Sequence, residues 1–233
     1  MQRKLNFSID EYYHIYSRGV DKRNIFIEKN DYNRFLFLMY LCNSNNPVNI
    51  SKLFEQVKFK KGPSFSDIFL IDKGENIVDI GVYCLMPNHF HLLLREKQDN
   101  GISLFIKKLL TGYSMYFNKK HKRSGALFEN RFKANHVSKD EYLKYLFSYI
   151  HLNPIKIINE KWKENTIFEK EKSKNFLNSY NYSSYLDYLG KDRIESKILQ
   201  KGSFPEFFDT NKSFENFIDD WLNYKTTETF DEN

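Results

Sequence analysis

Residues 77–95 read IVDIGVYCLMPNHFHLLLR and decide how the rest of the chain is interpreted. Two apolar runs, residues 77–86 and 89–95, are separated only by Pro87 and Asn88. Proline and asparagine are frequent turn residues, and runs of this length are typical of strands. The stretch therefore predicts two adjacent antiparallel strands joined by a tight turn.

The flanking segments predict elements that alternate with this pair. Residues 12–18, rich in tyrosine and isoleucine, favour a strand. The spacing of apolar residues predicts two helices with Asp31 and Ser103 as their N-caps, and Ser138 with Glu141 forms the capping-box pattern of a third helix. The order strand, helix, strand pair, helix, helix predicts an α+β fold, with an antiparallel sheet and helices packed on it.

The remaining segments suggest additions to this core. Residues 44–76 are polar and rich in turn formers, which indicates an insertion with a short helix near 53–57. The stretch 161–233 is charged and aromatic-rich, and it ends in an amphipathic piece. We expect one domain over residues 1–160 and a mostly helical, acidic C-terminal extension over 161–233.

Composition excludes several classes of protein. The 233 residues are 41% hydrophobic and 17% aromatic, too apolar for a chain that is disordered throughout. Two cysteines, Cys42 and Cys84, give neither a disulfide framework nor a zinc-finger spacing. No apolar run approaches the roughly 18 residues needed to cross a bilayer, and no signal peptide is evident. We expect a soluble cytoplasmic protein without a membrane partner.

The positive charge is concentrated before residue 160. The net charge is +6 overall, but residues 1–160 hold 25 basic and 16 acidic side chains, whereas 161–233 hold 11 and 14. Residues 104–133 form a basic segment with interleaved aromatic residues. Such a segment suits a groove for a nucleic-acid backbone, although a solvated helix face explains it about equally well. The candidate nucleic-acid-binding residues are Arg18, Lys22, Arg23, Lys107, Lys108, Lys119, Lys120, Lys122, Arg123, Arg131 and Lys133.

Two histidines share one face of the second predicted strand. His89 and His91 are two residues apart, so their side chains project together while Phe90 lies on the opposite face. Neutral imidazoles side by side can supply two ligands of a metal site if a third ligand comes from elsewhere. A hydrogen-bonded histidine pair on a sheet is the structural alternative.

A second candidate lies at the end of the last predicted helix. Tyr149 and Asn153 are four residues apart and therefore share a helix face, from which the tyrosine can reach a sheet with its hydroxyl in contact with solvent. Asn153 precedes Pro154, so it can also serve only to end the helix. We expect His151 to be an ordinary, partly exposed residue.

Together these segments resemble the IS200-like single-tyrosine transposases, also called HUH transposases, and within them the REP-associated tyrosine transposases. The resemblance is carried by residues 13–19 (YHIYSRG), 86–94 (MPNHFHLLL), 125–133 (GALFENRFK) and 149–154 (YIHLNP). It implies a ferredoxin-like sheet with the two histidines on a central strand.

The resemblance also implies roles for individual residues. His89, His91 and Asn153 would bind a divalent metal, Mg²⁺ or Mn²⁺, and Tyr149 would be the nucleophile that forms a 5′-phosphotyrosine on single-stranded, hairpin-associated DNA. Insertion-sequence relatives typically carry Gln at the third ligand position, so Asn153 agrees with the REP-associated branch. Because free histidines protonate near pH 6.5, we expect the metal site to weaken below that pH.

Two other functions compete with this interpretation. A non-catalytic protein of the same fold that binds a DNA or RNA hairpin would use the same lysines and aromatics. A zinc hydrolase based on His89 and His91 lacks an evident carboxylate ligand nearby. Both a monomer and a homodimer remain compatible with the sequence.

Overall fold

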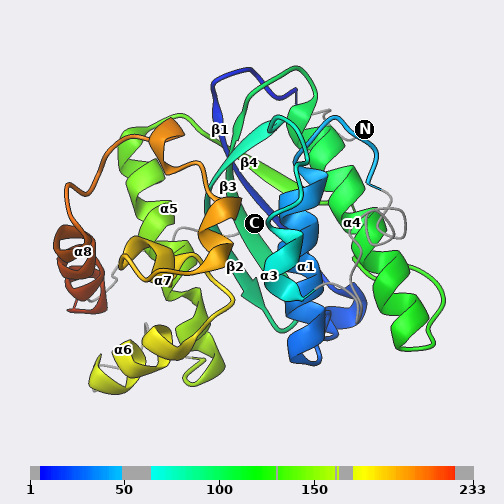
Figure 1. Ribbon diagram of the computed structural model, residues 1–233. Coiled ribbons are helices and arrows are strands. Elements are labelled where there is room, and N and C mark those ends of the chain that lie inside the picture. Colours follow the sequence, from blue (N-terminus) through cyan, green and yellow to red (C-terminus); the bar gives the residue numbers. More distant parts are fainter. Residues whose placement is uncertain (1–5, 49–63, 130, 161, 163–169, 224–233) are drawn as a thin grey trace.

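The computed structural model describes residues 6–48, 64–129, 131–160, 162 and 170–223 (Figure 1). Within these ranges the chain forms one four-stranded sheet with strand order β2-β3-β1-β4, and each neighbouring pair is antiparallel. Its elements are β1 (Tyr12–Arg18), α1 (Lys29–Cys42), β2 (Val78–Met86), β3 (His89–Glu96), α4 (Gly101–Lys120) and β4 (Lys133–Val137). This βαββαβ arrangement is ferredoxin-like, so the predicted α+β fold is confirmed.

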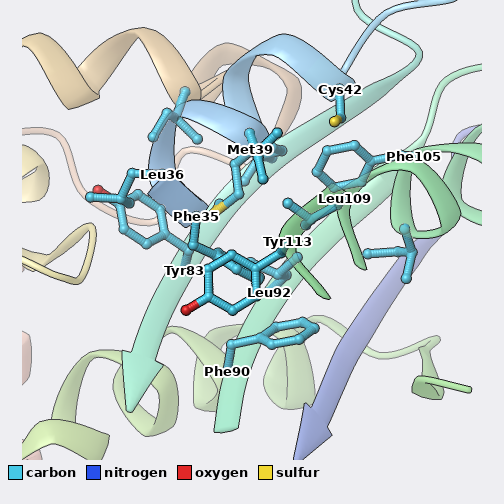
Figure 2. Packing of buried hydrophobic residues seen from close by; sticks show 14 of the residues in the cluster. Phe35, Leu36, Met39, Cys42, Tyr83, Phe90, Leu92, Phe105, Leu109 and Tyr113 are labelled. Carbon is cyan, nitrogen blue, oxygen red and sulfur yellow. The ribbon is translucent and has the colours of Figure 1, made fainter. Parts of the chain in front are cut away.

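Helices α1 and α4 cover one face of the sheet (Figure 1). Every second residue of β3, namely Phe90, Leu92 and Leu94, is buried against them, as Figure 2 shows for the first two. Burying each such side chain contributes roughly 1.5–3 kcal/mol. The residues between them, including His91 and Leu93, lie on the opposite face of the sheet.

Helix α5 (Asp140–Leu152) and the C-terminal segment cover that opposite face. After α5 the chain continues through η2 (Asn153–Ile157), α6 (Lys170–Ser179), α7 (Tyr185–Tyr188), η3 (Ile194–Ile198), η4 (Lys201–Ser203) and α8 (Asn211–Asn223). None of the helices in the described ranges is long and apolar enough to cross a membrane.

The C-terminal segment is bound along the edge of β2. The backbone N–H groups of Ser184 and Gln200 donate to the carbonyls of Tyr83 and Ile80 at 3.0 and 2.9 Å. The Leu85 N–H donates to the Tyr182 carbonyl at 2.9 Å. An edge strand left open is a site for association with other chains, and these bonds occupy the edge of β2.

Three expectations about element boundaries were wrong. Helix α5 begins at Asp140 after Lys139, and the capping box predicted from Ser138 is not formed. Helix α1 begins at Lys29, two residues before Asp31, whose carboxylate accepts hydrogen bonds from the backbone N–H groups of Ile27 and Glu28. Helix α4 begins at Gly101, two residues before the expected Ser103 cap.

The expected insertion is described only in part. Its helix predicted near residues 53–57 lies outside the described residues, and α3 (Phe65–Ile68) packs beside α1. Residues 73–76 return to the core, where the Asn43 side chain receives hydrogen bonds from the N–H groups of Ile77 and Val78. The end of α1 and the start of β2, which flank this segment, are therefore in direct contact.

Candidate active site

The two histidines lie near the start of β3, on the face covered by α5. In the β1–β3 register Arg18 lies opposite His89 and Tyr16 opposite His91. The imidazole rings of His89 and His91 are 5.0 Å apart and perpendicular, so strand alternation places them together as predicted.

Helix α5 brings Tyr149 directly over these histidines. Its ring meets that of His91 edge-on at 5.5 Å and an angle of 86°, and that of His14 at 6.0 Å. The tyrosine side chain is 8% exposed, which is less than expected for a residue beside the buried stripe of the helix. Two segments separated by more than fifty residues thus form one cluster.

The Nδ1 atoms of both histidines are already hydrogen-bonded within the chain. His89 Nδ1 lies 2.6 Å from Asn88 Oδ1, and Asn88 Nδ2 in turn donates to the Lys22 carbonyl at 3.2 Å. His91 Nδ1 lies 2.9 Å from His14 Nε2. These partners leave the Nε2 atoms of both metal-ligand candidates for another bond.

Asn153 is buried at the junction of α5 and η2. Its side chain is 1% exposed, and neither Oδ1 nor Nδ2 has a hydrogen-bond partner among the described residues. A buried amide without a partner costs about 1–3 kcal/mol, so it is normally retained for a reason. An oxygen ligand for a metal is such a reason.

The donor set of His89, His91 and Asn153 fits a divalent cation. Two neutral imidazoles and an amide oxygen are ordinary ligands for Mn²⁺ and related ions. No cluster of three His, Cys, Asp or Glu side chains that could hold a metal occurs in the described part of the chain. A metal bound by His89 and His91 would therefore need a third protein ligand of another type, and Asn153 is the candidate.

The environment favours neutral histidines. Burial, with smaller contributions from the positive charges of Arg18 and Lys156, lowers the pKa of His89 to about 3. Burial and the neighbouring histidines hold the pKa of His91 well below its ordinary value. Both shifts favour the neutral imidazoles that a metal would require.

Lys156 and His14 are two site residues that the sequence interpretation did not assign. Lys156 Nζ lies 5.4 Å from the centre of the Tyr149 ring. Its sequence signal is its position three residues after Asn153, on the turn that follows α5. Tyr16 lies opposite His91, and His14, two residues before Tyr16 on β1, shares its face of the sheet. The sequence pattern could indicate this only if the strand register were known.

The predicted basic surface is divided by the sheet. Lys107, Lys108, Lys119 and Lys120 belong to α4, which covers the face opposite the histidines. Lys108 donates to the carbonyls of Ser44 and Asn46, and Lys120 pairs with Asp31 at 2.8 Å. These α4 lysines are not part of the histidine face.

Other basic residues lie closer to the histidines. Arg18 pairs in register with His89, and Lys133 lies 5.8 Å from the ring of Tyr16. Lys22 and Arg23 lie in and after η1 (Val20–Lys22), beside Asn88. Lys122, Arg123 and Arg131 belong to the connection between α4 and β4, and Arg123 contacts Asn118 and Phe117 of α4 instead of the histidine face.

The expectation that His151 is partly exposed was wrong. His151 is fully buried, and its Nε2 lies 2.8 Å from the Ser184 hydroxyl oxygen. The C-terminal segment supplies a second packing surface to α5, including the ring of Phe214 at 5.2 Å. Helical periodicity within α5 alone could not show this surface.

Comparison with known proteins agrees with this arrangement. Residues 65–153 match a family model described as Transposase IS200 like. A solved structure of a REP-associated tyrosine transposase bound to a REP hairpin matches with a TM-score of 0.50 and 10% identity, over 84% of this chain and 90% of that one. At that identity the structural match concerns the fold. No curated protein matches the chain. The resemblance to IS200-like transposases is confirmed.

Proposed function

We propose that this chain is a metal-dependent single-stranded DNA endonuclease and strand transferase of the transposase type, with Tyr149 as its nucleophile. The observation that carries the proposal is the 5.5 Å edge-on contact between Tyr149 and His91, inside a segment that matches the IS200-like transposases. The match supports transposase-like DNA binding, and the contact adds a nucleophile beside the candidate metal ligands.

A divalent metal would be held by His89, His91 and the side-chain oxygen of Asn153. When bound, it would act as a Lewis acid that stabilises negative charge on the scissile phosphate. Two nitrogen ligands and one amide oxygen form a softer set than a typical magnesium site, so we expect Mn²⁺ to support activity at least as well as Mg²⁺.

Tyr149 would form one phosphoester bond while another is broken. Its hydroxyl oxygen bonds to phosphorus while the bond from phosphorus to the 3′ oxygen breaks. The phenol loses its proton to solvent and the departing 3′ oxygen gains one, which leaves a 5′-phosphotyrosine and a free 3′-hydroxyl. The reverse attack by another 3′-hydroxyl joins new ends without ATP, because the ester energy is retained.

The DNA backbone would follow the basic side chains around this face. Arg18 and Lys133 lie on β1 and β4 next to the cluster, and Lys156 lies next to Tyr149. Contacts of this kind release counterions, so binding should weaken steeply with added salt. Because one chain brings Tyr149 and His91 together, we propose that a single copy is sufficient for cleavage.

The test is capture of the covalent intermediate. Labelled single-stranded hairpin DNA is incubated with the protein and Mn²⁺ and then separated on a denaturing protein gel. We expect an adduct with the wild type that is absent from Tyr149→Phe. Tyr145→Phe is the matched control, because Tyr145 stacks on Tyr149 at 5.8 Å from one turn earlier in α5.

Two results would contradict this proposal in different ways. An adduct that persists in Tyr149→Phe would assign the nucleophile elsewhere. Salt-sensitive hairpin binding without any adduct, in Mn²⁺ and in Mg²⁺, would identify the chain as a non-catalytic binding protein of the same fold.

A further inference from the structure

We propose that His14 is a positioning residue for His91: its Nε2 accepts a hydrogen bond from His91 Nδ1–H and so keeps the lone pair of His91 on Nε2. The inference rests on the proposed function, because a free Nε2 is useful only if His91 binds a cation. It assigns a role to a histidine of β1, outside the pair on β3.

The contact between the two rings is short and buried. His14 Nε2 and His91 Nδ1 are 2.9 Å apart, and both side chains are buried. Their rings are nearly parallel, with centroids 5.1 Å apart and 22° between their planes. The backbone holds this geometry, because the antiparallel register places Tyr16 opposite His91 and His14 two residues further along the same face of β1.

A neutral pair of imidazoles can make this hydrogen bond in two ways. If His91 donates from Nδ1, its Nε2 keeps a lone pair and can bind a metal. If His14 donates from Nε2, a neutral His91 must carry its proton on Nε2, where it blocks coordination. The function of His91 therefore depends on which ring donates, and His14 must be the acceptor.

His89 shows how the same requirement is met without a second histidine. Its Nδ1 lies 2.6 Å from Asn88 Oδ1, and an amide oxygen can only accept. The Asn88 orientation is fixed by its Nδ2, which donates to the Lys22 carbonyl. The acceptor of His89 is thus fixed by chemistry, whereas His91 depends on the tautomer of His14. Metal-binding histidines commonly use their other ring nitrogen in this way.

The His14 ring also packs against two tyrosines. It lies 5.0 Å from the ring of Tyr16 and 6.0 Å from that of Tyr149. A substitution must therefore preserve ring volume if it is to separate hydrogen bonding from packing.

Two variants make that separation. His14→Gln keeps an acceptor near the position of Nε2, and His14→Phe keeps an aromatic ring but removes the acceptor. The first measurement is the tautomer of His91 in the metal-free wild type, by NMR of nitrogen-15-labelled histidine at pH 7.5. The second is Mn²⁺ affinity, by isothermal titration calorimetry of each variant.

We expect the proton of His91 on Nδ1 in the wild type. The Mn²⁺ affinity should be close to wild type in His14→Gln and about 10- to 100-fold weaker in His14→Phe. A His91 proton on Nε2 in the wild type would overturn the inference, and so would equal Mn²⁺ affinities in all three proteins. A loss in His14→Gln as large as in His14→Phe would also overturn it.

The tautomer measurement needs no variant, so a misfolded His14→Phe leaves the inference testable. Neither readout depends on DNA cleavage. If Tyr149 forms no adduct while the tautomer and affinities are as expected, the proposed nuclease fails and the role of His14 stands. If the adduct forms while His91 carries its proton on Nε2, the role of His14 fails alone.

Discussion

Lys156→Gln should slow DNA cleavage without abolishing it. The Lys156 ammonium lies 5.4 Å from the centre of the Tyr149 ring, on the turn that also carries Asn153. Cleavage places negative charge on the tyrosine oxygen as it attacks and on the phosphate oxygens. A fixed positive charge at this distance stabilises that charge, and glutamine removes it while retaining a similar length.

The size of the effect follows from the distance. With the 5.4 Å distance to the ring centre taken as the approximate separation of the charges, and an effective dielectric constant of about 20, two unit charges interact by about 3 kcal/mol. Lys156 is half-buried, so screening by solvent reduces this value to about 1.5–2.5 kcal/mol. Since each 1.36 kcal/mol is tenfold in rate, we expect single-turnover cleavage to fall about 10- to 100-fold.

The control is a lysine of the same region that does not face the histidines. Lys144 is an exposed residue of α5 whose Nζ lies 5.6 Å from the ring of Phe217, in the C-terminal segment. Lys144→Gln removes the same charge and should leave the rate within about threefold of wild type. Lys156→Arg should retain most of the activity. Equal rates in Lys156→Gln and Lys144→Gln would refute the electrostatic argument.

Three further predictions concern stability and metal binding. Asn153→Leu should raise the free energy of unfolding of the metal-free protein by about 1–3 kcal/mol, because it replaces a buried unpaired amide. The same substitution should abolish Mn²⁺ binding. A lower free energy of unfolding, measured by urea denaturation, would contradict this prediction. Burial lowers the pKa of His14 to about 4 and that of His151 to about 3. Below pH 6.5 the unfolded state therefore binds more protons than the folded state. The free energy of unfolding should then fall by about 1.4 kcal/mol per pH unit for each histidine. His151→Asn should reduce that slope, and an unchanged slope in urea titrations at pH 4.5–6.5 would contradict the assignment. Ser184→Ala should cost about 1–3 kcal/mol, because its hydroxyl accepts from the Tyr83 N–H at 3.0 Å and contacts His151, whereas the exposed Ser179→Ala should cost little.

The central strands could be predicted because their sequence is regular. Strand β2 is apolar over nearly its whole length, β3 carries an apolar centre (Leu92–Leu94), and one proline-asparagine turn sets their pairing. Alternation along β3 then placed His89 and His91 on one face. Tyr149 and Asn153 followed from helical spacing, together with the resemblance to a family.

Strand β4 was not predicted, because it is short and polar. Its residues read KANHV, and only Val137 is buried. It is a strand because β1 offers an open edge, to which residues 133–137 bind in antiparallel register. Local propensity contains no information about that partner.

The roles of His14 and Lys156 depend on tertiary contacts in the same way. His14 becomes a partner of His91 only through the β1–β3 register. Lys156 comes close to Tyr149 because η2 turns back toward the sheet after Pro154. The sequence does not show that His14 lies next to His91 or that Lys156 lies next to Tyr149. These distances arise from the packing of the folded chain.

The C-terminal segment connects the sheet to α5, the helix that carries the proposed nucleophile. Ser184 accepts a hydrogen bond from the backbone of β2 at Tyr83 and contacts His151 of α5 at 2.8 Å. His151 lies between Tyr149 and Asn153 in sequence, but its side chain packs against Phe214 and Tyr188 of the C-terminal segment. One side of α5 is thus fixed by the C-terminal segment while Tyr149 is held over the histidines. Because a shift of about 1 Å in a reacting group can cost two orders of magnitude in rate, we infer that this segment contributes to cleavage by fixing the position of α5.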